Sequence, residues 1–131
     1  GAVVHTHPRY GTAVAAVRRD LPAFNYYGSA AGGTTIRCAP YATFGTQLLS
    51  DYVQRALEDR TACLLANHGM VAVGDTLEEA KQLAIEVEML CRMYLTALQA
   101  GEPHVLSDEE MQEVLDRFED YKSPPARKPW E

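Results

Sequence analysis

The sequence has no long apolar run and no excess of positive charge. No stretch approaches the ~20 consecutive apolar residues of a membrane-spanning helix, so we expect no membrane partner. Aspartate and glutamate together number 18, against 12 lysines and arginines, which gives a formal net charge of −6. Because a nucleic-acid backbone attracts a basic surface, this balance also argues against a nucleic-acid partner.

Several catalytic and metal-binding motifs are missing as well. The chain contains no glycine-rich phosphate loop, and no Ser or Cys stands in a nucleophile motif. The three cysteines form no C-x-x-C pair, so we expect no cysteine zinc site. Cys38, Cys63 and Cys91 each lie among apolar residues. Their odd number and their surroundings indicate buried thiols in a reducing, cytoplasmic compartment.

What is present fits one globular domain with one core. The 131 residues are 47% hydrophobic and 23% charged, which is ordinary for such a domain. The chain has no initiator Met and starts within a strand-like stretch that already carries two histidines. We therefore expect it to be the C-terminal portion of a longer protein.

The apolar pattern predicts helices and strands throughout the chain. We expect a first strand over residues 1–7, helices over 8–19 and 43–59, and strands over 34–38, 62–66 and 70–73. Two capping boxes, Thr76 with Glu79 and Ser107 with Glu110, predict a long helix that ends at Gly101 and a final helix after it. Three prolines and mixed charges in 120–131 predict a mobile tail.

The first strand carries His5 and His7 on one face. Side chains alternate along a strand, so these two imidazoles point the same way, about 7 Å apart, and Thr6 points the opposite way. Imidazole is the commonest side-chain metal ligand, but His5 and His7 could equally be polar residues at the end of a strand. The pattern alone leaves both readings open.

A third histidine, His68, lies 61 residues after His7 in the expected turn Asn67-His68-Gly69. Asn and Gly explain a tight turn because both tolerate positive φ, whereas the His at its apex is unexplained. Three His ligands with an open position form a common catalytic zinc site. A histidine in a turn can also be merely solvated, as we expect for His104.

At this point the chain resembles the class II aldolase/adducin family, and within it the L-fuculose-phosphate aldolase branch. The resemblance spans nearly the whole chain, and the spacing of His7 and His68 is also similar to that branch. It is carried by five stretches: Ala2-Val3-Val4-His5-Thr6-His7, Ala30-Ala31-Gly32-Gly33, Ala39-Pro40-Tyr41-Ala42-Thr43-Phe44-Gly45-Thr46, Asn67-His68-Gly69 and Leu106-Ser107-Asp108-Glu109-Glu110.

The resemblance implies a three-layer α/β/α domain with a mixed, largely antiparallel central sheet. It assigns residues 1–121 to this domain and leaves 122–131 as a Pro-rich charged tail. It also implies a divalent metal, usually zinc, held by His5, His7 and His68. The expected assembly is a homotetrameric ring with active sites between neighbouring subunits.

The implied reaction is cleavage of a small sugar phosphate, similar to L-fuculose 1-phosphate, into glycerone phosphate and an aldehyde. A metal supplies the Lewis acid for the charge that develops as the carbon–carbon bond breaks. A second group must move a proton at the aldehyde oxygen, and the resemblance assigns this to Tyr26 of a neighbouring subunit. It further places Tyr121 over the site and Phe44 and Phe118 in its wall. From the residues alone, Tyr26 could simply pack a loop with Tyr27.

The chain departs from the family pattern in two ways. The family's acid/base Glu and its phosphate pocket precede the His-x-His strand, and neither is in this sequence. The basic residue expected after Tyr121 is not clearly matched, although Lys122 or Arg127 could substitute. We therefore expect the 131-residue chain itself to bind metal incompletely, to lack aldolase activity and to form an oligomer.

Three alternatives stay open at this stage. A sugar-phosphate epimerase or dehydratase of the same family would use the same metal platform. A non-catalytic assembly module, as in the adducin branch, would not need three histidines. A metal-dependent hydrolase of another fold could also use His-x-His, although the stretch Tyr41–Thr46 gives no reason for one.

Overall fold

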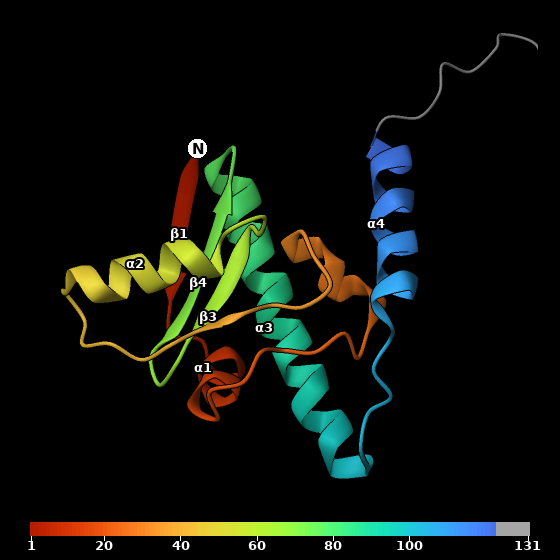
Figure 1. Cartoon of the computed structure of the whole chain (residues 1–131), viewed down its shortest axis with the longest axis horizontal. Coiled ribbons are helices and arrows are strands. Elements are labelled where there is room, and N and C mark those ends of the chain that lie inside the picture. The colour runs from red at the N-terminus through yellow and green to blue at the C-terminus, as the bar shows by residue number, and fades with distance from the viewer. Residues whose placement is uncertain (123–131) are drawn as a thin grey trace, which may run out of the picture.

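The computed structural model describes residues 1–122, with side chains described for 1–120. Within residues 1–122, four strands form one sheet: β1 (Ala2–Thr6), β2 (Cys38–Ala39), β3 (Ala62–Leu65) and β4 (Gly69–Gly74). The described part of the chain also forms four α-helices and one 3₁₀-helix: α1 (Arg9–Ala16), η1 (Tyr26–Ala31), α2 (Gln47–Ala56), α3 (Leu77–Ala100) and α4 (Asp108–Lys122). Figure 1 shows their arrangement, with α2 and α4 at opposite ends of the view.

The sheet is mixed and has the order β1-β4-β3-β2. β4 pairs antiparallel with both β1 and β3, whereas β2 runs parallel to β3. β3 and β4 form a hairpin, and the register places His5 opposite Val71 and Thr6 opposite Met70. The end of β1 therefore lies beside the turn of the hairpin.

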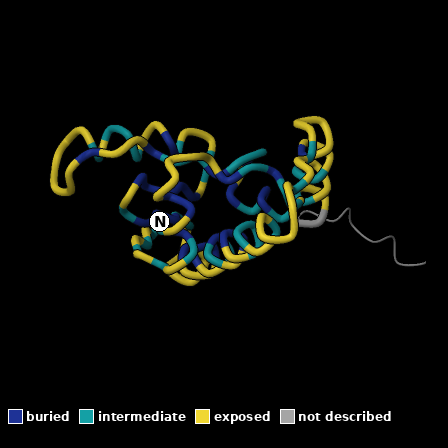
Figure 2. Tube along the Cα trace, turned by 90° about the horizontal axis from the view of Figure 1, so that it is seen from below, coloured by how far each residue is buried: buried dark blue, intermediate teal, exposed yellow. Residues whose placement is uncertain are grey.

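Alternation along the strands divides the core between the two faces of the sheet. Leu64, Met70 and Ala72 pack with α1, η1 and α3 on one face. Cys63, Leu65 and Val71 pack with α2 on the other face. Figure 2 shows the buried segments at the centre of the molecule, while α4 is largely exposed and α2 is half exposed. The predicted three-layer α/β/α architecture with a mixed sheet is confirmed.

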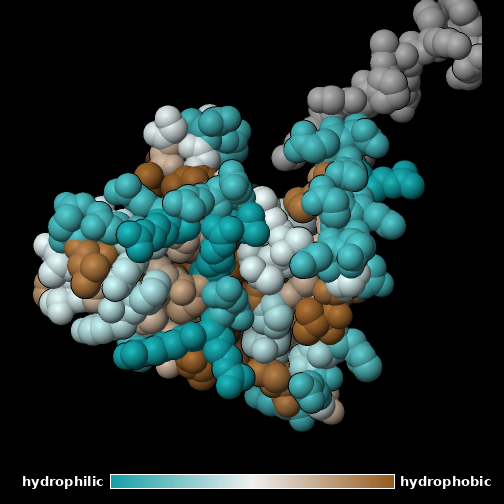
Figure 3. Space-filling model, viewed as in Figure 1, coloured by the Kyte–Doolittle hydropathy of each residue, from teal (hydrophilic) through white to brown (hydrophobic). Residues whose placement is uncertain are grey.

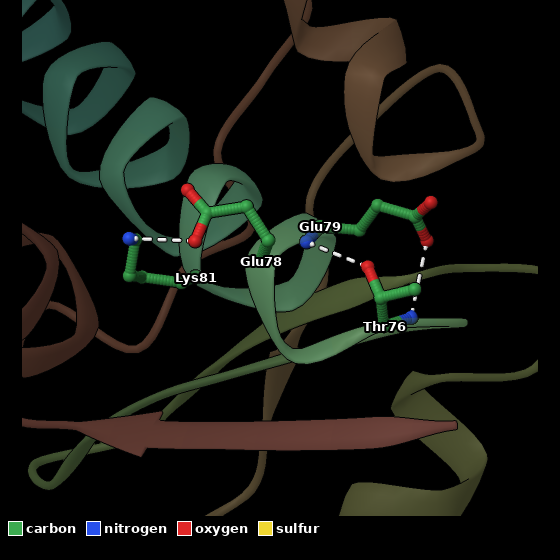
Figure 4. Close-up of polar contacts among 4 residues, drawn as sticks. All are labelled: Thr76, Glu78, Glu79 and Lys81. Carbon is green, nitrogen blue, oxygen red and sulfur yellow. Dashed lines mark hydrogen bonds and ion pairs between the residues drawn. The ribbon is translucent and has the colours of Figure 1, made fainter.

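The helices that begin at capping boxes also agree with the prediction. Thr76 accepts a hydrogen bond from the Glu79 amide, and the Glu79 carboxylate accepts one from the Thr76 amide (Figure 4). Ser107 and Glu110 make the same reciprocal pair at 3.1 and 2.8 Å. Each box satisfies amides that a helix start leaves without intrahelical partners. No helix in residues 1–122 is long and apolar enough to cross a membrane.

The prediction of a strand over residues 34–38 is wrong. Ile36 forms an isolated antiparallel bridge with Leu21 instead of joining the sheet. Only Cys38 and Ala39 pair with β3, and Pro40, which has no N–H group to donate, follows directly. The segment before β2 is therefore a connection whose Ile36 side chain is buried in the core.

The predicted helix boundaries need three corrections. α1 ends at Ala16 rather than near residue 19, and Arg18 adopts a left-handed φ of 54°. α2 begins at Gln47 rather than 43, because the Thr46 side chain accepts a hydrogen bond from the Leu49 amide and acts as its N-cap, and it ends at Ala56 rather than 59. The predicted tail from residue 120 is wrong at its start, because α4 continues through Lys122. The remainder of that tail lies outside the described residues.

Candidate metal centre

His5, His7 and His68 come together at the end of β1, as the sequence predicts. His5 lies in β1, His7 directly follows that strand, and His68 lies in the turn between β3 and β4. Their nearest ring nitrogens all lie within 4.8 Å of one another, and each pair of ring centroids is 4.9 Å apart. We call these three residues the histidine cluster.

The spacing of the nitrogens fits a single metal ion. The Nε2 atoms of His5 and His7 are 3.1 Å apart. Zinc bound tetrahedrally at 2.0–2.1 Å requires nitrogens about 3.3 Å apart. The cluster therefore needs only small side-chain movements to hold a divalent metal with one coordination position left for another ligand.

The tautomer of His5 is fixed by the backbone of β4. Its Nδ1 donates a hydrogen bond of 2.9 Å to the main-chain oxygen of Met70, because a carbonyl can only accept. The lone pair of His5 is then on Nε2, the atom that faces Nε2 of His7. A backbone carbonyl behind the ring is the usual outer partner of a metal-binding histidine.

The protonation of His68 is also biased toward a metal-binding form. Partial burial lowers the pKa of its imidazole below 6.5, and the proximity of His5 and His7 lowers it further. A neutral imidazole has a free lone pair, whereas imidazolium does not. The neighbouring rings therefore favour the form of His68 that can bind a metal.

The turn that carries His68 is anchored to the end of α1. The Asn67 amide donates to the Ala15 oxygen at 3.2 Å, and Arg18 Nε donates to Asn67 Oδ1 at 2.6 Å. The Arg18 guanidinium lies 5.6 Å from the ring centre of Tyr41. Asn67 has a φ of 54°, as expected for an Asn in a tight turn. Sequence reasoning missed Arg18, because no local pattern links it to a turn 49 residues away.

Gly69 has a different role from the one its place in a turn suggests. It is not a positive-φ residue but the first residue of β4. A Cβ atom on Gly69 would lie 2.5 Å from the Thr6 oxygen and 2.7 Å from Cδ2 of His7. Glycine is therefore required so that the end of β1 and the His7 ring can approach the hairpin.

The cluster opens onto a hollow of about 350 Å³ beside α2, which we call the α2 hollow. His5 and His68 line it together with Phe44, Thr46 and Leu49. Phe44 is 81% exposed, so its ring borders open space rather than core. Figure 3 shows apolar surface over the N-terminal end of α2 on the viewed face. An organic ligand at the cluster would have apolar side chains within reach.

Tyr26 and Phe118 do not line the α2 hollow. They border a separate hollow of about 420 Å³ between η1 and α4, together with Glu110, Glu113 and Arg117. Tyr26 is 55% exposed and stacks edge-on against Tyr27, with ring centres 6.2 Å apart. The predicted site residues therefore fall into two groups within one chain.

Three further residues named in the sequence analysis lie partly or wholly outside the described residues. Tyr121 and Lys122 belong to α4, but their side chains fall outside the described residues, as does all of Arg127. In the described part of the chain, no Asp or Glu joins the histidine cluster. His104 is exposed and stands apart from the cluster, as expected.

The sequence and the fold both match known proteins. The family model "Class II Aldolase and Adducin N-terminal domain" matches residues 1–95. The chain is 49% identical to 5-methylthioribulose-1-phosphate/5-deoxyribulose-1-phosphate aldolase of Rhodospirillum rubrum, covering 96% of this chain and 60% of the relative. It is 51% identical to L-fuculose phosphate aldolase of Escherichia coli K12, covering 92% of this chain and 56% of the relative.

Solved structures give the same result. A structure of L-fuculose 1-phosphate aldolase superposes with a TM-score of 0.85 at 41% identity, covering 89% of this chain and 55% of that chain. The chain thus spans a little over half the length of the relatives that it matches. The family match includes β1, the β3–β4 hairpin and hence all three histidines of the cluster. The chain belongs to the class II aldolase/adducin family and resembles its fuculose-phosphate aldolase members.

Proposed function

We propose that this chain is the metal-holding part of a class II aldolase that cleaves a small sugar phosphate. The observation that carries the proposal is the convergence of His5, His7 and His68 within 4.8 Å. An assembly module such as an adducin head has no need for three converging imidazoles with one tautomer fixed by the backbone. The same cluster would suit an epimerase or dehydratase of the family, which remains the alternative.

The three histidines hold a divalent ion, for which zinc is our first choice. Nitrogen ligands and a four-coordinate arrangement suit zinc, although other divalent metals accept imidazole. When bound, such an ion acts as a Lewis acid toward a substrate carbonyl and stabilises the negative charge left by bond cleavage. The α2 hollow admits the substrate, and the Phe44 ring forms an apolar wall beside it.

The proton at the aldehyde oxygen is handled by Tyr26 of a second copy of the chain. The Tyr26 side chain is more than half exposed and borders a different hollow from the cluster. Within a homotetramer, the face with Tyr26 and Phe118 would meet the α2 hollow of its neighbour. Tyr121 would act from the same helix as Phe118. In this assignment both copies contribute to each site.

The substrate class follows from the names of the relatives. One acts on L-fuculose phosphate, and another on 5-methylthioribulose 1-phosphate and 5-deoxyribulose 1-phosphate. We infer a small ketose 1-phosphate that is cleaved to glycerone phosphate and an aldehyde. The three free cysteines, two of them fully buried, are consistent with a reducing cytoplasmic location.

Metal analysis of the purified chain tests the proposal. We expect the chain to retain measurable zinc, below one ion per chain, after loading and dialysis, because the family's acid/base Glu is not in this sequence. We expect this zinc to be lost in His68→Ala. His104→Ala is the matched control, because His104 is exposed and lies outside the cluster. Wild-type chain without bound metal would favour the assembly module instead.

Two further measurements separate the remaining possibilities. The first is a coupled assay for glycerone phosphate, run on a longer protein that contains the family's acid/base Glu. Release of glycerone phosphate distinguishes cleavage from epimerisation or dehydration. For the 131-residue chain alone we expect no turnover, because no carboxylate joins the cluster in the described residues. Sedimentation velocity is expected to show an oligomer, and a monodisperse monomer would contradict the shared site.

A further inference from the structure

His7 is the member of the histidine cluster that lies outside both the β1–β4 ladder and the hairpin turn. His5 lies within the β1–β4 ladder, and His68 is held in the hairpin turn. The ladder ends at Thr6, opposite Met70, so His7 lies one residue beyond it. Among the described residues, the His7 side chain is hydrogen-bonded to His5 alone. The position of His7 therefore depends on the segment that follows it, which is Pro8 and the first turn of α1.

The first turn of α1 has no cap of its own. Pro8 is the N-cap residue, and its side chain has no oxygen to accept a hydrogen bond. An N-cap side chain normally accepts from the amide of the second or third helical residue, which are here Tyr10 and Gly11. The backbone of Pro8, at φ −74° and ψ 154°, is nevertheless suitable for an N-cap.

Glu88 of α3 supplies the missing acceptor from 78 residues away. Its carboxylate accepts hydrogen bonds from the Tyr10 amide at 3.0 and 3.1 Å and from the Gly11 amide at 2.7 Å. These are the two amides that an N-cap side chain would satisfy. A carboxylate at this place also interacts favourably with the positive end of the helix dipole.

The same turn is held on its other sides. The Arg92 guanidinium lies 5.7 Å from the ring centre of Tyr10. A Cβ atom on Gly11 would lie 3.0 Å from Pro8 and 3.6 Å from the Met70 sulfur, so the turn packs directly on β4. The first turn of α1 is therefore clamped between α3 and the strand whose Met70 carbonyl orients His5.

We propose that Glu88 is a positioning residue for the histidine cluster, which it serves by capping α1 and thereby fixing His7. This inference rests on the proposed metal site. Glu88 does not touch the cluster, so it acts only through the backbone of Pro8 and α1. Nothing in the local sequence around Glu88 indicates this role.

A Co²⁺ titration of the folded chain, followed by visible absorption, tests the role of Glu88. Glu88→Gln keeps one acceptor oxygen but loses the negative charge that strengthens the hydrogen bonds from Tyr10 and Gly11. We therefore expect it to bind Co²⁺ several-fold more weakly and with an altered visible band. Glu86→Gln is the matched control on the same helix, because Glu86 contacts Tyr27 and Gln82 rather than α1. Urea titrations of each variant establish that the titrated protein is folded.

A rescue separates positioning from general stability. Adding Pro8→Ser to Glu88→Gln places a local acceptor at the N-cap, and we expect it to recover most of the lost affinity. Equal Co²⁺ affinity in wild type and Glu88→Gln would overturn the proposal, and so would an equal loss in Glu86→Gln or a failure of the rescue in folded protein.

The ring signals of His7 in NMR spectra of the metal-free chain provide a readout that does not need the metal. We expect them to shift in Glu88→Gln and to stay unchanged in Glu86→Gln. If wild type bound no Co²⁺, the proposed metal site would fail, while these signals would still decide whether Glu88 positions His7. An unshifted His7 signal in Glu88→Gln would count against its positioning role.

Discussion

Gly69 and His7 approach so closely that a Cβ atom on Gly69 would lie 2.7 Å from the His7 ring. Gly69→Ala must push away the end of β1, because the Thr6 oxygen is closer still. We expect a loss of about 2 kcal/mol in the free energy of unfolding and a clear loss of zinc affinity. Urea denaturation and zinc titration measure the two effects.

Gly28→Ala is the control for this substitution. Gly28 is also buried, but a Cβ atom there would meet nothing within 4 Å. We expect nearly unchanged zinc affinity in Gly28→Ala. Wild-type affinity in Gly69→Ala would show that the close approach at the hairpin does not matter for the cluster.

Metal should stabilise the fold through the histidine cluster. A ligand that binds only the native state adds about 2.7 kcal/mol at 100 times its Kd. We expect zinc to raise the unfolding midpoint of the chain, and a chelator to reverse the increase. His7→Ala should abolish the shift while His104→Ala retains it, so a shift of equal size in both variants would place the metal elsewhere.

The three thiols should react slowly in the folded chain. Burial raises the pKa of Cys63 and Cys91 to about 12, and burial with the nearby Asp20 charge raises the pKa of Cys38 to about 11. At pH 8 a thiol with a pKa of 11 is ionised in about one molecule in a thousand. Since only the thiolate is nucleophilic, alkylation should be slow and should accelerate about tenfold per pH unit.

Cys38 should be alkylated first, because it is half-buried while the other two are fully buried. The urea-unfolded chain is the control, since its thiols have ordinary pKa values near 8.5 and equal access. Mass spectrometry of peptides after timed iodoacetamide exposure gives the order. Rapid labelling of Cys63 or Cys91 in the folded chain at pH 8 would contradict the buried β3 and α3 environments.

The capping box at the start of α3 should contribute more to the free energy of unfolding than the adjacent ion pair does. Thr76→Ala removes the side-chain acceptor of the Glu79 amide and is expected to cost about 1 kcal/mol. Lys81 and Glu78 form an exposed pair at 2.8 Å, so Lys81→Ala should change stability by less than about 0.5 kcal/mol. Urea denaturation midpoints of the two variants measure these changes. A larger loss of stability in Lys81→Ala than in Thr76→Ala would contradict the prediction.

Much of the fold and the core of the site could be predicted from local patterns. The period of two in β1 placed His5 and His7 on one side, and the capping boxes marked the starts of α3 and α4. The prediction of a strand over 34–38 is wrong because of a tertiary contact: Ile36 pairs with Leu21 and not with the sheet. Local propensity does not encode that choice of partner.

The residues that hold the cluster in place could not be predicted in the same way. Glu88 and Arg18 form hydrogen bonds with elements that are far from them in sequence. The residues next to them in the sequence carry no motif that would indicate these contacts. Gly69 was recognised as a turn glycine, although its small size rather than its φ is required. Such contacts depend on three-dimensional proximity, which periodicity and capping motifs do not report.

β1 lies at one edge of the sheet and is paired only with β4 within the described residues. A strand at the edge of a sheet is paired on one side, so it opens locally at a lower free-energy cost than a central strand does. An ion shared by His5, His7 and His68 would fasten this strand to the hairpin as a covalent crosslink would. Binding of the metal and pairing of β1 with β4 are then thermodynamically coupled, and the complete site exists only while β1 is paired.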